Sequence, residues 1–206
     1  MRKALSLIAL VVAGFTLAAA PDAARAETLV ERSNVRNRSA FAQWTYSDVT
    51  TTTFVDIVAA EIAVSPTSSS GAEPFLLVTV VRTDNATGEF LFSGFGQTSQ
   101  FALQVKGNLS SAHLSAALDL QDSVSGAIEP FTVNLTFTGV GEVFEEKNHF
   151  TSNEGGMIVN VFFDGLQRDA SATSTVSGLG INFTPVPAAV AFIQKLHSGT
   201  VLVTKE

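Results

Sequence analysis

Apolar and polar residues alternate along several short stretches of this chain, and this alternation restricts the possible folds more than any other feature. In residues 131–138 the odd positions are Phe, Val, Leu and Phe, and the even positions are Thr, Asn, Thr and Thr. Successive side chains of a β-strand point to opposite faces, so one face of this segment is apolar and the other is polar. The segment is therefore predicted to be a strand with one buried face.

Further strands are expected where similar patterns or short apolar runs lie between turn-forming residues. The expected strands comprise residues 75–81, 89–95, 101–106, 157–166, 170–177 and 199–204. Residues 84–88 predict a hairpin turn, and residues 167–169 predict another. Residues 112–120 are ambiguous, because their alanines also tolerate a helix. Residues 188–197 fit either a short helix or a strand, since apolar residues recur at helical spacing but include good strand formers.

Many short strands separated by Gly, Pro, Asn and Ser predict an all-β fold. The favoured architecture is an antiparallel β-sandwich, a closed β-barrel is the alternative, and at most one short helix is expected, near the C-terminus. No repeat with a fixed period is present, which excludes solenoids and propellers. Residues 65–74 are predicted to be a loop within a single domain and not a linker between two domains.

The first 26 residues resemble an export signal. Arg2 and Lys3 precede an apolar run over residues 4–20, and Ala24-Arg25-Ala26 supplies the small residues that signal peptidase requires. We expect cleavage after Ala26 and a single β domain over residues 27–206. The expected location is the periplasm, the cell surface or the medium. An uncleaved anchor is the competing interpretation of the apolar run, but no run of similar length follows.

Composition narrows the possible partners. Without the leader the chain would keep nine basic and 18 acidic residues, a net charge of −9. Nucleic acids and anionic membranes select basic surfaces, so neither is an expected partner. The absence of cysteine from the sequence excludes disulfides, thiol nucleophiles and cysteine-ligated metal sites.

The most concentrated group of charged residues lies within residues 141–154. Glu145, Glu146 and His149 are candidate ligands for a divalent cation, since carboxylates and imidazole are common metal ligands. Alternation in a strand would place Glu145 and Glu146 on opposite faces, which weakens a shared site. The competing interpretation is a solvated strand end followed by a hairpin loop, with residues 145–156 as a recognition loop.

Trp44 and Tyr46 are the only residues of their kinds in the chain. Their spacing places both rings on one face of a strand, where they could stack on a sugar or hold an apolar ligand. They could equally be core residues, each with a hydrogen bond to its polar edge.

The sequence contains no catalytic motif that we recognise, and it predicts no catalytic residue and no cofactor. The leading functional hypothesis is an exported, non-catalytic binding or surface-interaction protein, whose partner would be a protein, a glycan or an apolar small molecule. The first alternative is a barrel or sandwich that encloses an apolar ligand among its phenylalanines. The second is an extracellular glycan hydrolase, which requires two carboxylates in a cleft.

Overall fold

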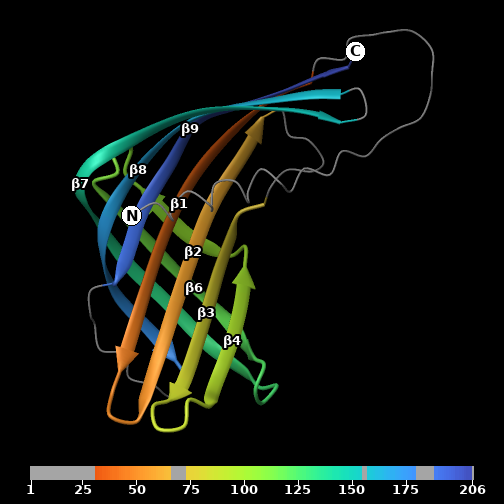
Figure 1. The fold of residues 1–206 in the computed structure, drawn as a ribbon. Coiled ribbons are helices and arrows are strands. Elements are labelled where there is room, and N and C mark those ends of the chain that lie inside the picture. Colours follow the sequence, from red (N-terminus) through yellow and green to blue (C-terminus); the bar gives the residue numbers. More distant parts are fainter. Residues whose placement is uncertain (1–30, 66–72, 155–156, 180–187, 206) are drawn as a thin grey trace.

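The computed structural model describes residues 31–65, 73–154, 157–179 and 188–205 (Figure 1). The expected leader and most of the expected loop over residues 65–74 lie outside these ranges. The described residues form β-strands joined by turns, and none of them is helical. The strands are β1 (Glu31–Ser47), β2 (Thr51–Ser65), β3 (Phe75–Asp84), β4 (Phe90–Thr98), β5 (Phe101–Val105), β6 (Ser111–Asp122), β7 (Ile128–Glu154), β8 (Met157–Gly178) and β9 (Val190–Lys205).

All nine strands belong to one antiparallel sheet, in the order β4-β3-β2-β1-β9-β8-β7-β6-β5. Strand β4 also pairs with β6, so the hydrogen bonds run round in a ring. The predicted all-β antiparallel class is confirmed. Both ends of the described chain contribute to the ring, because β1 pairs with β9 over residues Glu31–Gln43. Figure 1 shows β1 and β9 side by side in the sheet.

The ring closes through a short seam between β4 and β6. Only Gly94 and Phe95 of β4 pair with β6, opposite Asp122 and Gln121. The Asp122 carboxylate strengthens the seam, since its Oδ1 accepts a hydrogen bond of 3.0 Å from the backbone N–H of Ser93. The backbone N–H of Ser123 donates to the Ser93 carbonyl at 2.9 Å. The β4–β6 ladder has two residue pairs, and these contacts of Asp122 and Ser123 with Ser93 add to it.

An apolar core fills the inside of the ring. The alternation in residues 131–138 is confirmed: the four odd-numbered side chains are buried and the four even-numbered ones are exposed. The other walls contribute Val55 and Ile57 from β2, Leu114 and Leu120 from β6, and Ile193 from β9. Burial of apolar surface on this scale is the main term that stabilises a cysteine-free domain.

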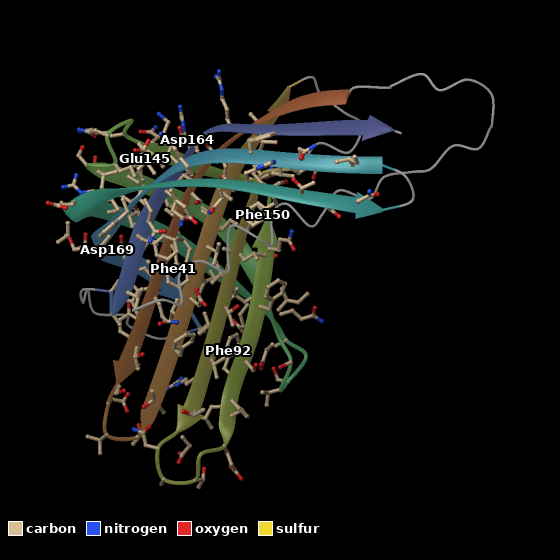
Figure 2. The ribbon with its side chains drawn as sticks, turned by 45° about the horizontal axis from the view of Figure 1, so that its top comes forward. Phe41, Phe92, Glu145, Phe150, Asp164 and Asp169 are labelled. Atoms are coloured by element: carbon tan, nitrogen blue, oxygen red, sulfur yellow. The ribbon has the colours of Figure 1, made fainter. Side chains whose placement is uncertain are left out.

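Strands β7 and β8 continue beyond the ring as a projecting arm (Figure 2). We define the arm as residues 143–154 of β7 and 157–168 of β8, which pair with each other along their whole length. Residues 199–205 of β9 pair with the same part of β8 on its other side. A bulge between Gly139 and Val143 separates the ring part of β7 from the arm.

Several local predictions need correction. Residues 167–169 do not form a turn: they lie inside β8, where neighbours on both sides provide continuous pairing. Residues 145–154 of the expected loop are part of β7, where they pair with β8 on one side. The two ambiguous segments are strands, since residues 112–120 lie in β6 and residues 190–197 lie in β9.

Candidate functional site

The three candidate metal ligands lie on the arm but do not face one another. Glu145 forms an ion pair with Lys147, with 3.0 Å between Oε1 and Nζ. Glu146 is on the opposite face and accepts a hydrogen bond from the Asn148 amide. His149 stacks on Phe162, with ring centroids 4.1 Å apart. Within the described residues, no group of three acidic or histidine side chains is arranged to hold a metal ion.

Trp44 and Tyr46 share the inner face of β1, as their spacing predicted. Trp44 is completely buried within the core, and Tyr46 is partly buried against it. The Trp44 indole Nε1 is buried and has no hydrogen-bond partner. Because Trp44 contacts core side chains, its ring is not available for stacking on a sugar from solvent.

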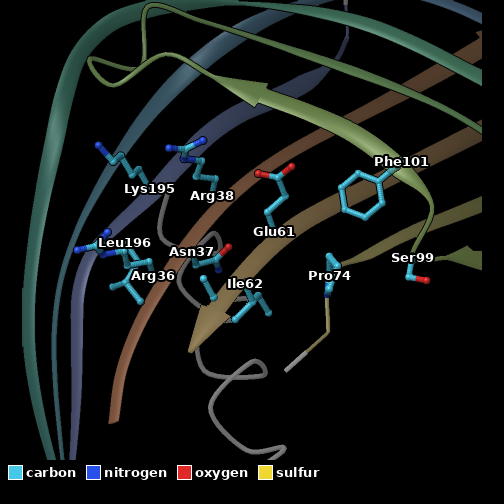
Figure 3. Close-up of a pocket in the computed structure, with 11 residues that line it drawn as sticks. Arg36, Asn37, Arg38, Glu61, Ile62, Pro74, Ser99, Phe101, Lys195 and Leu196 are labelled. Carbon is cyan, nitrogen blue, oxygen red and sulfur yellow. The ribbon is translucent and has the colours of Figure 1, made fainter. Parts of the chain in front are cut away.

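A hollow lined by several charged side chains lies at the end of the ring from which the arm projects. Here a pocket of about 690 Å³ opens to solvent (Figure 3). Strands β1, β2, β5 and β9 contribute to it, together with two connecting segments. The charged side chains among its lining are Arg36, Arg38, Glu61 and Lys195. Phe101, Ile62, Pro74 and Leu196 provide apolar lining. We call this hollow the mouth pocket.

Strand register explains why these charges gather. Arg38 of β1 lies directly opposite Lys195 of β9 and, on its other side, opposite Glu61 of β2. Directly paired residues of an antiparallel sheet present their side chains on the same face. The three side chains therefore form a row across three strands, and Figure 3 shows them pointing to the same side. Arg36 lies two residues before Arg38, on the same face of β1.

The next row inward is apolar. Ala40 of β1 pairs with Ile193 of β9 and with Ala59 of β2, and all three residues are buried. The charged row therefore stands directly above the core, at the boundary between apolar interior and solvent. A charge at such a boundary is less well screened than one on an open surface.

The cations of the mouth pocket are not neutralised by ion pairs. Within the described part of the chain, the ion pairs join Lys147 to Glu145 and to Asp164, and none involves Arg36, Arg38 or Lys195. The pocket lining has three cationic side chains and one carboxylate. This excess of positive charge occurs in a chain with a net charge of −7.

A second, smaller hollow of about 340 Å³ adjoins the first. It shares Arg38 and adds Lys106 and His113, which approach from β6 and the segment before it. Lys195 also reaches toward this side: its Nζ lies 3.9 Å from where a side chain at Gly107 would begin. Arg38 therefore lines both hollows, one with Lys195 and the other with Lys106.

Sequence reasoning missed these residues, although one signal was present. Arg36 and Arg38 are separated by one residue, Asn37, in a segment that precedes the strand pattern of Trp44 and Tyr46. Two basic residues at that spacing share a strand face. Lys195 could not be associated with them, because its opposition to Arg38 depends on the pairing of the first and last strands.

The fold and the mouth pocket define an all-β ring protein with a cationic open end. Comparison of the chain with protein-family models, with curated proteins and with solved structures finds no match. In the part of the chain that the structure describes, no helix is long and apolar enough to cross a membrane.

Proposed function

We propose that this chain is a non-catalytic binding protein whose mouth pocket holds a small anionic molecule. The observation that carries this proposal is the row of Arg38 and Lys195, joined by Arg36, with no ion-pair partner among the described residues. Glu61 is the single carboxylate beside these three cations, so the cations repel one another, and a bound anion would relieve that repulsion.

The pocket lining also suggests the chemistry of the ligand. Arginine presents a planar fork of N–H donors that matches carboxylate and phosphate oxygens, whereas lysine acts as a compact point charge. Phe101, Ile62 and Pro74 provide apolar contact beside these charges. The ligand we propose therefore carries a carboxylate or phosphate group on a partly apolar body.

The core beneath the pocket supports a position for the proposed ligand at the open end. Inner side chains of the ring pack against one another in one apolar cluster that includes Trp44, Phe131 and Phe137. A ligand would rest on this cluster and not within it. The leader sequence adds the proposal that binding takes place outside the cytoplasm.

Thermal unfolding in the presence of chosen anions tests the proposal. We would compare inorganic phosphate, citrate and decanoate with glucose, an uncharged control, at a constant ionic strength set with sodium chloride. A ligand at about 100 times its Kd adds about 2.7 kcal/mol to the free energy of unfolding. For a chain of this length that corresponds to a rise in Tm on the order of 5–10 °C.

Variants that each lose one positive charge, either in the pocket or on the arm, distinguish binding in the pocket from a general effect of net charge. R38Q and K195Q each remove one positive charge from the pocket, and K147Q removes one from the arm. We expect the two pocket variants to lose the ligand-induced rise in Tm and K147Q to keep it. The proposal fails if no anion raises Tm, or if all three variants respond alike.

A further inference from the structure

Among the described residues, one edge of the arm has no strand beside it. Strand β6 pairs with β7 only as far as Thr138, whereas β7 continues to Glu154 and pairs with β8 on its other side. Within the described residues, nothing pairs with the outer edge of residues 143–154. Such an edge presents alternate backbone N–H and C=O groups that can form a ladder with another strand.

The charges of this edge, Lys147 and three glutamates, protect it only in part against pairing. Sheet edges are commonly blocked by proline or by charges, and residues 143–154 contain no proline. Lys147, at the centre, is the single cation of the segment, and its charge is balanced by Glu145 at 3.0 Å and Asp164 at 3.9 Å. The side chains of Phe144 and Phe150 are 59% and 56% exposed.

The edge is complementary to itself when read antiparallel about Lys147. A two-fold axis at that residue places Phe144 opposite Phe150 of the partner subunit, and Glu145 opposite His149 of the partner subunit. Each pairing occurs twice by symmetry. Aromatic pairs are among the cross-strand combinations that stabilise a sheet, and the Glu145 carboxylate can accept a hydrogen bond from an imidazole N–H. Each Lys147 would lie opposite Lys147 of the partner subunit, a contact of like charges that is offset by Glu145 of its own chain at 3.0 Å and by Glu145 of the partner subunit on the diagonal.

We propose that two copies of this chain associate through residues 143–154 of β7 in this register, which joins their arms into one continuous antiparallel sheet. The ladder would cover the outer edge of residues 143–154, and the phenylalanine rings would pack across the two-fold axis. The mouth pockets lie on the rings, outside the paired segments, so this association does not depend on ligand binding.

Site-specific crosslinking tests the register. The chain has no cysteine, so one introduced cysteine reacts alone. The register places residue 147 beside its own symmetry mate, and K147C should be captured as a covalent dimer by mild oxidation or by a short bismaleimide. T151C is the matched control on the same face, because its symmetry mate would lie eight residues away, about 26 Å.

A charge-pair experiment tests the interface without crosslinking. F144K and F150E each place a charge against a phenylalanine ring of the partner subunit, and each should weaken dimerisation at least about tenfold. Mixing the two variants restores one native aromatic pair and creates one pair of opposite charge, so the mixture should form a heterodimer. F90K is the control, since Phe90 is exposed on β4, away from the arm.

Sedimentation velocity over a range of protein concentrations measures these outcomes, with Tm as a check that each variant is folded. A concentration-dependent dimer, with crosslinking of K147C but not T151C, supports the proposal. A monomer at every concentration, equal crosslinking of both cysteine variants, or a mixture that remains monomeric would overturn it.

Discussion

At the scale of single residues, Asp122 joins the turn after β6 to the seam of the ring. Its side chain is 4% exposed and accepts hydrogen bonds from the Ser125 hydroxyl and from the backbone N–H groups of Ser93, Val124 and Ser125. These donors favour the ionised carboxylate and lower the pKa of Asp122 from 3.8 to about 2.

The lowered pKa of Asp122 predicts a loss of stability in acid. A carboxyl group whose pKa is lower in the folded state stabilises the fold above its unfolded pKa, and this contribution disappears as the pH falls through the folded value. We expect the free energy of unfolding to fall between about pH 4 and pH 2. Asp48, whose pKa is also lowered to about 2, contributes in the same window.

Urea unfolding of D122N across this range measures the contribution of Asp122. The variant should be less stable than the wild type at pH 7, and the difference should shrink towards pH 2. D119N is the matched control, because Asp119 is exposed on the same strand. A constant difference between D122N and the wild type at every pH would contradict the assignment.

Gly96 allows β4 to approach β6 closely at the seam. A Cβ atom there would lie 2.5 Å from the Asp119 carbonyl oxygen and 2.8 Å from the Leu120 side chain. The carbonyl belongs to the backbone and cannot move aside cheaply, so we expect G96A to lower the free energy of unfolding by about 1–3 kcal/mol. G107A, where no atom lies closer than 3.9 Å, should be near neutral. Urea titration checks both values.

At the scale of elements, the bulge in β7 decides where the ring ends and the arm begins. Gly141 has a φ of +70°, which L-residues adopt at a cost, and its carbonyl accepts a hydrogen bond of 3.1 Å from Arg168 Nε. Arg168 lies on β8 opposite Val143, so this bond ties the bulge to the neighbouring strand.

Substitution of Gly141 tests this description of the bulge. G141A should reduce the free energy of unfolding by about 1–2 kcal/mol, because a left-handed backbone is unfavourable for alanine. There is open space around the missing side chain, so the cost would be conformational and not steric. Asparagine tolerates this conformation better, and G141N should lose less. Equal losses in the two variants by urea unfolding would argue against a conformational cause.

At the scale of the whole molecule, charge is distributed unevenly. The chain is acidic, yet Arg36, Arg38 and Lys195 gather at the open end of the ring, whereas the arm balances Lys147 with two carboxylates. Arg38 and Lys195 lie directly opposite each other on one face of the sheet, an arrangement of like charges that reduces stability.

Because Arg38 and Lys195 repel each other, we expect that removing one of these charges stabilises the ligand-free fold but weakens anion binding. K195Q should raise the free energy of unfolding of the ligand-free protein by a few tenths of a kcal/mol, up to about 1 kcal/mol, because it removes the repulsion. The same change should weaken binding of the anion. The gain should diminish at high salt, where exposed charges are screened. A loss of stability in K195Q at low salt would contradict this expectation.

The strand class and much of the core could be predicted because they depend on neighbours along the chain. Alternation in residues 131–138 already determined which side chains would be buried, and the turn over residues 84–88 joined β3 to β4 as expected. The predicted turn at residues 167–169 failed because polar residues are also compatible with a strand that has partners on both sides.

The sequence by itself determined an antiparallel all-β chain, the burial pattern of its clearest strand and the shared face of Trp44 and Tyr46. The tertiary structure decided the rest. It put Trp44 into the core, stacked His149 on Phe162, and brought Arg38 beside Lys195 through the pairing of the first and last strands. The physical reason is that local periodicity reports which face a side chain occupies, whereas strand order and register report which residues meet on that face.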